Sequence, residues 1–204
     1  MGEHRQCHHS GADCCADGTG CHKLCTFYQQ DAMIQELFPM TIGEEEVLDE
    51  RRLLTGVEDG EFMPAGQVRY LILHCSATRC NCDYTVKQLM RDHKARGFQT
   101  IGYHFYIRKD GTLTQHRRLL EVGAHCRPFN RCSIGICYEG GLNKKGCPAD
   151  TRTPQQIERM RELLQILHKL FPHAVVRGHR DMPGTVPKEC PCFDVVSFMQ
   201  EGVF

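Results

Sequence analysis

The chain has 204 residues, which is enough for one ordinary domain with a sizeable core and an additional segment. Its 25 basic residues balance 25 acidic ones, so the net charge gives no reason to expect nucleic acid or an anionic membrane as a partner. No apolar run approaches the length of a membrane span and the N-terminus is polar, so we expect neither a span nor a signal peptide.

The N-terminal 25 residues combine histidines with five of the chain's 14 cysteines, namely Cys7, Cys14, Cys15, Cys21 and Cys25. Without an export signal we expect a reducing cytosol, where cysteines are thiols or metal ligands. A small zinc knuckle that binds a partner is one interpretation, but the segment has no CxxC pair. We favour a flexible tail, because termini without apolar periodicity are usually poorly ordered.

The next segment leads into a folded domain. The charged run Glu44 to Leu54 has a few leucines and suggests an amphipathic helix. Gly56 to Gly66 contains further glycine and proline and is typical of a linker. We therefore predict a Cys/His-rich extension with its linker over residues 1–66, and a folded domain over residues 67–204.

Strands and a helix alternate in the first half of this domain. Val68 to His74 is an apolar run that predicts a strand. Asp83 or Thr85 caps a helix to about Arg96. Its inner face carries Val86, Leu89, Met90 and His93, and we expect His93 to be a surface or boundary histidine and not a ligand. A hairpin follows, with strands at Ile101 to Arg108 and Thr112 to Gln115, around an Asp-Gly pair that favours a tight turn.

The second half continues the alternation. Ile134 to Tyr138 predicts a buried central strand, and Thr153-Pro154 predicts the start of a helix with apolar residues at helical spacing. Val175-Val176 predicts a short strand, and Phe193 to Phe204 a closing helix whose Val195, Val196 and Phe198 cover apolar surface. The order indicates an α/β fold: a mixed central β-sheet with helices packed on its faces.

Histidines stand at the ends of two predicted strands. His74 ends the first strand, and His179 lies just past Val175-Val176. A loop stiffened by prolines returns Lys188 and Cys190 towards His179. Imidazole and thiolate suit a zinc ion, and three protein ligands with an open fourth position are typical of a catalytic zinc. A lysine beside them suits a developing negative charge.

Two other metal arrangements compete with this interpretation. Cys192 is the obvious fourth ligand for a closed structural zinc. We nevertheless favour the open site, with Cys190 as the third ligand. A second metal at Cys75, Cys80 and Cys82 lacks an evident fourth ligand.

Six segments together resemble one family. They are LILHCSAT (71–78), GYHFYIRKDGT (102–112), VGAH (122–125), NRCSIGICYEGG (130–141), GHRDM and PKECPCFD. In this order they resemble the type-2 N-acetylmuramoyl-L-alanine amidases, zinc enzymes that include phage lysozyme-like amidases and are related in fold to peptidoglycan recognition proteins. The resemblance covers about Gln67 to Phe198 and implies an amidase/peptidoglycan-recognition-like fold.

The resemblance also implies roles for individual residues. Tyr103 would orient the zinc-bound water or assist its proton transfer, and Lys188 would donate to the oxyanion. His125 and Asn130 would bind substrate in a groove, with Arg117 shaping the same wall. Each role has an alternative that involves no function. Tyr103 would be an ordinary strand aromatic. Lys188 and Arg117 would be solvated side chains, and His125 would be a hydrogen-bonded loop histidine.

The implied reaction is hydrolysis of the amide between N-acetylmuramic acid and L-alanine in peptidoglycan. One alternative is a peptidoglycan-binding module without turnover, although retention of Cys190 argues for an enzyme. Another is a regulatory protein that binds an unknown partner through residues 1–66. We expect the chain to be cytoplasmic as made and to act on the cell wall after release.

Overall fold

The computed structural model describes residues 41–42, 45–46, 48–49, 61–185 and 188–202. The cysteines of the N-terminal extension and the first part of the predicted linker, residues 56–60, lie outside these residues. Among the described residues, no helix combines the length and apolar character needed to cross a membrane.

A six-stranded mixed sheet forms the centre of the domain, with the strand order β10-β4-β8-β6-β7-β3. Neighbouring strands are parallel except β6 and β7, which form the antiparallel hairpin. The strands are β3 (Leu48–Asp49), β4 (Tyr70–Cys75), β6 (Phe105–Ile107), β7 (Leu113–Gln115), β8 (Ser133–Tyr138) and β10 (Val175–Gly178).

Four shorter strands form two further pairs. β1 (Thr41–Ile42) pairs antiparallel with β2 (Glu45–Glu46), and β5 (Thr78–Arg79) pairs parallel with β9 (Gly141–Leu142). The described residues between 44 and 54 are therefore extended in β2 and β3, and the helix predicted there is wrong for them.

In the part of the chain that the structure describes, three α-helices begin at side-chain caps. Thr85 caps α2 (Val86–Ala95) and Thr153 caps α3 (Pro154–Leu170), each in a reciprocal capping box with a glutamine. Asp194 caps α4 (Val195–Gln200), in which Val195 and Phe198 are buried. Val196 is 56% exposed, so the prediction that it covers apolar surface is wrong. The 3-10 turns are η2 (Ala65–Gln67), η3 (Phe129–Cys132) and η4 (His179–Asp181).

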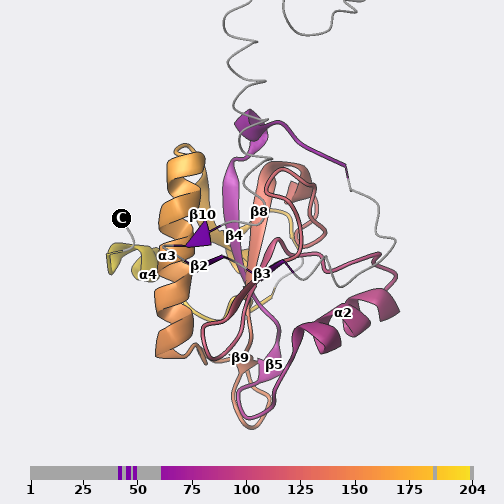
Figure 1. Cartoon of the computed structure of the whole chain (residues 1–204). Helices are drawn as coiled ribbons and strands as arrows, with labels where there is room; N and C mark the ends of the chain where they lie inside the picture. Colours follow the sequence, from indigo (N-terminus) through magenta and orange to yellow (C-terminus); the bar gives the residue numbers. More distant parts are fainter. Residues whose placement is uncertain (1–40, 43–44, 47, 50–60, 186–187, 203–204) are drawn as a thin grey trace, which may run out of the picture.

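The two long helices lie on opposite sides of the sheet (Figure 1). Successive strand residues point to opposite faces. Leu71 and Leu73 of β4 accordingly belong to the core cluster that contains the buried residues of α3, whereas Ile72 belongs to another cluster. By the same alternation His74 points away from α3. The fold is the predicted α/β arrangement with a mixed sheet covered by helices.

The hairpin loop differs from the predicted tight turn. Only Gly111 of the Asp-Gly pair has a positive φ, 86°, and the Gly111 N–H donates to the Arg108 carbonyl. The strand bond from Arg108 N–H to the Thr112 carbonyl then encloses three residues. This combination is a turn followed by a left-handed glycine, the usual three-residue hairpin.

The described end of the predicted linker packs on the domain. The Met63 N–H donates to the Leu120 carbonyl at 2.8 Å, and the Met63 side chain is only 3% exposed. Phe62 forms an isolated bridge with Glu121. These contacts attach residues 61–65 to the core cluster, and the boundary at residue 66 stays a prediction.

Candidate metal centre

Two neighbouring strands deliver the two predicted histidine ligands to the same edge of the sheet. β10 is parallel to β4, with Gly178 opposite Leu73 in register. The residue after each of these is a histidine, so His179 and His74 come side by side, with ring centroids 4.6 Å apart. The register of one strand pair thus brings together two residues that are far apart in sequence.

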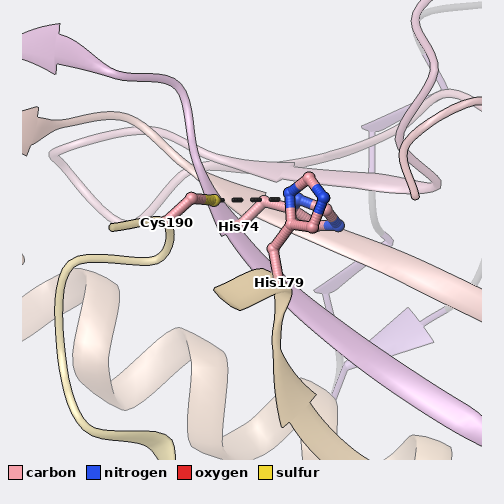
Figure 2. A group of neighbouring side chains, drawn as sticks. All are labelled: His74, His179 and Cys190. Atoms are coloured by element: carbon pink, nitrogen blue, oxygen red, sulfur yellow. Dashed lines mark hydrogen bonds between the residues drawn. The ribbon is translucent and has the colours of Figure 1, made fainter. Parts of the chain in front are cut away.

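Cys190 completes a compact group. One ligand atom from each of His74, His179 and Cys190 lies within 4.8 Å of the others, and His74 Nδ1 is 3.8 Å from Cys190 Sγ. Figure 2 shows the three side chains pointing toward one another from β4, the turn after β10 and the following loop. Both histidines are buried.

Backbone contacts hold the loop of Cys190 in place. The Cys75 N–H points at Cys190 Sγ at 3.3 Å, and the Arg180 N–H donates to the Cys190 carbonyl at 2.8 Å. The Asp181 carboxylate accepts from the Gly178 N–H at 3.1 Å. A Cβ at Gly178 would come within 2.8 Å of Pro191 Cδ, so the close approach of loop and strand requires glycine there.

The His74 and His179 side chains are uncharged near pH 7. Burial, followed by the nearby His125, His179 and Lys188, lowers the pKa of His74 well below its ordinary value. Burial and the Lys188 ammonium lower the pKa of His179 to about 4. A metal ligand must offer an unprotonated nitrogen, so these rings are in the state that ligation needs.

The donor set and its spacing fit a zinc ion. Bonds of about 2.0 Å to nitrogen and about 2.3 Å to sulfur place tetrahedral donors roughly 3.3 to 3.8 Å apart. From their 4.8 Å limit the three donors therefore need to close by no more than about 1 to 1.5 Å. Two imidazoles and one thiolate leave a fourth position available.

His125 lies behind His74. His74 Nε2 is 3.0 Å from His125 Nδ1, on the side of the ring away from Cys190. Burial, then His104, lowers the pKa of His125 well below its usual range, so this ring is neutral and its Nδ1 can accept the His74 N–H. A Cβ at Gly135 would lie 2.6 Å from the His125 ring, so glycine in β8 makes the room that His125 occupies.

Tyr103 and Lys188 line the same cavity as the three predicted ligands, a space of about 310 Å³. The Tyr103 ring centroid is 5.1 Å from that of His74. Burial, followed by Cys137, raises the pKa of Tyr103 well above its ordinary value, so its phenol stays protonated. Lys188 is exposed. The structure thus brings both predicted catalytic residues to the candidate centre.

A second cavity of about 560 Å³ is lined in part by His125, His179 and Lys188, which also line the first. Asn130 lines it too, but its Oδ1 accepts from the N–H groups of His125 and Cys126 at 2.9 and 2.8 Å. Asn130 therefore shapes the loop of His125, in addition to facing the cavity.

Arg117 lies inside the wall and faces neither cavity. Its guanidinium donates to the carbonyls of Ile101 and Val122, each at 2.9 Å, and pairs with Glu121 at 2.8 Å. The residue is 8% exposed and is absent from the linings of both cavities. Arg117 therefore supports the cavity wall from within and is not part of the wall's surface.

A family model described as N-acetylmuramoyl-L-alanine amidase matches residues 64–193. The chain belongs to this family. The endolysin of Enterobacteria phage K11 is 37% identical over 142 residues, which cover 70% of this chain and 92% of the endolysin. The endolysin of Escherichia phage T7 is 38% identical over 61% of this chain and 81% of its own length.

Solved structures agree with the assignment to the amidase family. N-acetylmuramoyl-L-alanine amidase LysC from Clostridium intestinale superposes with a TM-score of 0.59 at 26% identity, covering 77% of this chain and 97% of LysC. Bumblebee PGRP-SA superposes with a TM-score of 0.57 at 20% identity, and the match covers 72% of this chain and 88% of PGRP-SA. At this identity the likeness shows the fold alone. The amidase family's relation to peptidoglycan recognition proteins is thereby confirmed.

Sequence reasoning missed one residue of the amidase cavity. His93 is 2% exposed, accepts the Gly102 N–H on Nδ1 at 2.9 Å and lies 5.4 Å from the Tyr103 ring centroid. The prediction of a surface or boundary histidine is wrong. The prediction that His93 shares the inner face of the helix with Leu89 agrees with this burial.

Proposed function

We propose that this chain is a zinc-dependent hydrolase of the amide that joins the lactyl group of N-acetylmuramic acid to L-alanine in peptidoglycan. The observation that carries the proposal is the convergence of His74, His179 and Cys190 beside a cavity lined by Tyr103 and Lys188. A bound zinc supplies an acidified water and polarises the scissile carbonyl.

Each catalytic residue has a defined task in this proposal. The protonated Tyr103 phenol donates a hydrogen bond that orients the attacking water. The Lys188 ammonium donates to the oxygen that becomes negative in the tetrahedral intermediate, a contact typically worth about 3 kcal/mol of barrier. His125 accepts from His74 and so fixes the orientation of that ring.

The deciding experiment combines metal analysis with release of L-alanine peptides from purified cell walls. His179→Ala and Cys190→Ala should lose both metal and hydrolysis, because each removes a donor of the group. Lys188→Ala should keep the metal and lose the rate by about a hundredfold or more. His173→Ala and Cys147→Ala replace exposed residues outside this group and should change neither.

Two results would contradict the proposal. Metal and peptide release that both survive Cys190→Ala would remove the assigned centre. Zinc binding without any peptide release would favour the alternative, a peptidoglycan-binding module without turnover, as likeness to the peptidoglycan recognition proteins allows.

We also propose that the activity resides in residues 67–204, and that the Cys/His-rich extension serves a separate purpose such as binding a partner. The protein would reach the cell wall after release from the cell. A chain beginning at residue 41 retains β1 and β3, so it should keep one equivalent of zinc and full peptide release. Loss of either would place part of the active machinery in the extension.

A further inference from the structure

Two thiols outside the metal-competent group lie close together beneath the candidate centre. Cys75 Sγ and Cys192 Sγ are 3.7 Å apart, although 117 positions separate them in sequence. Cys75 is the last residue of β4, immediately after His74, and Cys192 follows Cys190 by two positions. The two thiols therefore lie where the segment that carries His74 meets the segment that carries Cys190.

The backbone around the pair favours this contact. A Cβ at Gly141 would lie 2.4 Å from Cys75 Sγ and 3.5 Å from Cys192 Sγ, so the thiols are packed over a bare glycine. Cys192 has a φ of 68°, rare for a residue with a side chain, and its N–H donates to the Glu189 carbonyl at 2.6 Å. The turn thus holds the Cys192 thiol toward Cys75.

We propose that Cys75 and Cys192 form a disulfide when the protein meets a low-molecular-weight disulfide such as oxidised glutathione. The bond would link the end of β4 covalently to the loop that carries Cys190. The sulfurs need to approach by about 1.7 Å to reach the S–S bond length of about 2.05 Å. This inference does not depend on the proposed hydrolytic function.

The proposed bond uses none of the three predicted ligands, although Cys190 packs against the same core cluster as Cys192. Cys75 belongs to the core cluster on the α3 face of the sheet, and Cys192 packs against that cluster. His74 points to the other face by the alternation of β4. A bond between Cys75 and Cys192 therefore forms on the face opposite to the His74 ring, and it does not use Cys190.

The reaction proceeds by two thiol–disulfide exchanges. Cys192, which is partly exposed, attacks oxidised glutathione as a thiolate and releases one glutathione thiolate. Cys75, which is buried, then attacks Cys192 Sγ in the mixed disulfide and releases the second. Two protein thiols are oxidised, one glutathione disulfide is reduced to two glutathione molecules, and the two protein protons pass through solvent to the released thiolates.

The test uses the full zinc-loaded chain incubated with oxidised glutathione at mildly alkaline pH, followed by non-reducing peptide mapping by mass spectrometry. We expect a peptide pair that joins Cys75 to Cys192, with the loss of two hydrogens. The melting temperature should rise by about 5 °C or more, since the bond closes a long loop. Zinc content should be unchanged, and a reductant should reverse the shift.

Two variants serve as controls. Cys192→Ser should abolish both the linked peptide and the shift in melting temperature, whereas Cys147→Ser, which replaces an exposed cysteine, should retain both. Three results would overturn the proposal: a persistent glutathione adduct on Cys192, a bond from Cys190 that expels zinc, or a shift in melting temperature that survives Cys192→Ser.

Discussion

At the scale of single residues, the candidate centre is organised by histidines with different tasks. His74 and His179 face Cys190, while His125 contacts the opposite nitrogen of His74. His104 lies further back, where its Nδ1 accepts from Gly135 and its Nε2 contacts the Glu121 carbonyl. His74, His125 and His104 thus form a row from the cavity into the core. The orientation of the predicted ligand His74 therefore depends on residues outside the predicted ligand set.

His125→Ala should weaken zinc binding by about 10- to 100-fold, because it removes the acceptor that orients the His74 ring. Competition with a chromophoric chelator measures the affinity directly. His173→Ala, at an exposed position, provides the control. An unchanged affinity in His125→Ala would show that His74 needs no orienting partner.

Tyr103→Phe should keep the zinc content and lower the rate of peptide release by about a hundredfold, since only the donor group is removed. The ring remains available to pack against His74 and His93. Steady-state kinetics should place the loss in kcat. A variant with the wild-type rate would assign the Tyr103 phenol to packing.

At the scale of elements, α3 is attached to the sheet by a polar side chain at its first turn. Gln156 is fully buried and belongs to the capping box of Thr153. Its amide donates to the carbonyls of Ile107 at 3.1 Å and Glu139 at 3.0 Å, which end β6 and follow β8. One glutamine therefore connects a helix start to two strand ends.

Gln156→Leu should lower the free energy of unfolding by about 2 to 4 kcal/mol, because two buried carbonyls lose a donor and the capping box is broken. Urea denaturation measures the change. The adjacent Gln155 is exposed, so Gln155→Leu offers a matched control that should remain within about 0.5 kcal/mol of the original. Equal losses in the two variants would contradict the assigned contact.

At the scale of the whole molecule, the core contains histidines that are held uncharged. Burial, followed by His93 and Arg117, lowers the pKa of His116 to about 3. Burial, followed by Arg117, also lowers the pKa of His104 to about 3. The unfolded chain therefore binds more protons than the folded chain from about pH 6.5 down to about pH 3, and the folded state loses stability as the pH falls through this range.

For His116 alone, the loss in unfolding free energy between pH 7 and pH 5 should be about 2 kcal/mol. His116→Gln removes this titration, so its stability should depend less steeply on pH by about that amount. His173→Gln, at an exposed site, should parallel the original chain. Chemical denaturation at several pH values gives the slopes, and parallel slopes for all three chains would refute the assignment.

Much of this architecture follows from local sequence. The apolar runs of β4 and β8 and the capping residues Thr85 and Thr153 identify their elements because strand burial and helix starts are encoded within a few positions. The motif around Cys190 likewise indicates a metal ligand before any contact is known. The length of β6 and the conformation of the loop at Gly111 were predicted less accurately, because the ends of an element depend on the residues that pack around them.

The sequence by itself determined the order of the main strands and helices of the domain, the mixed α/β fold and the residue types suited to zinc. Only the tertiary structure decided that His125 contacts His74, that Arg117 turns into the wall and that Cys75 meets Cys192. The physical reason is distance along the chain. Periodicity reports which face of an element is buried, whereas the His125 and Cys75 contacts depend on strand register and loop path across 51 and 117 positions.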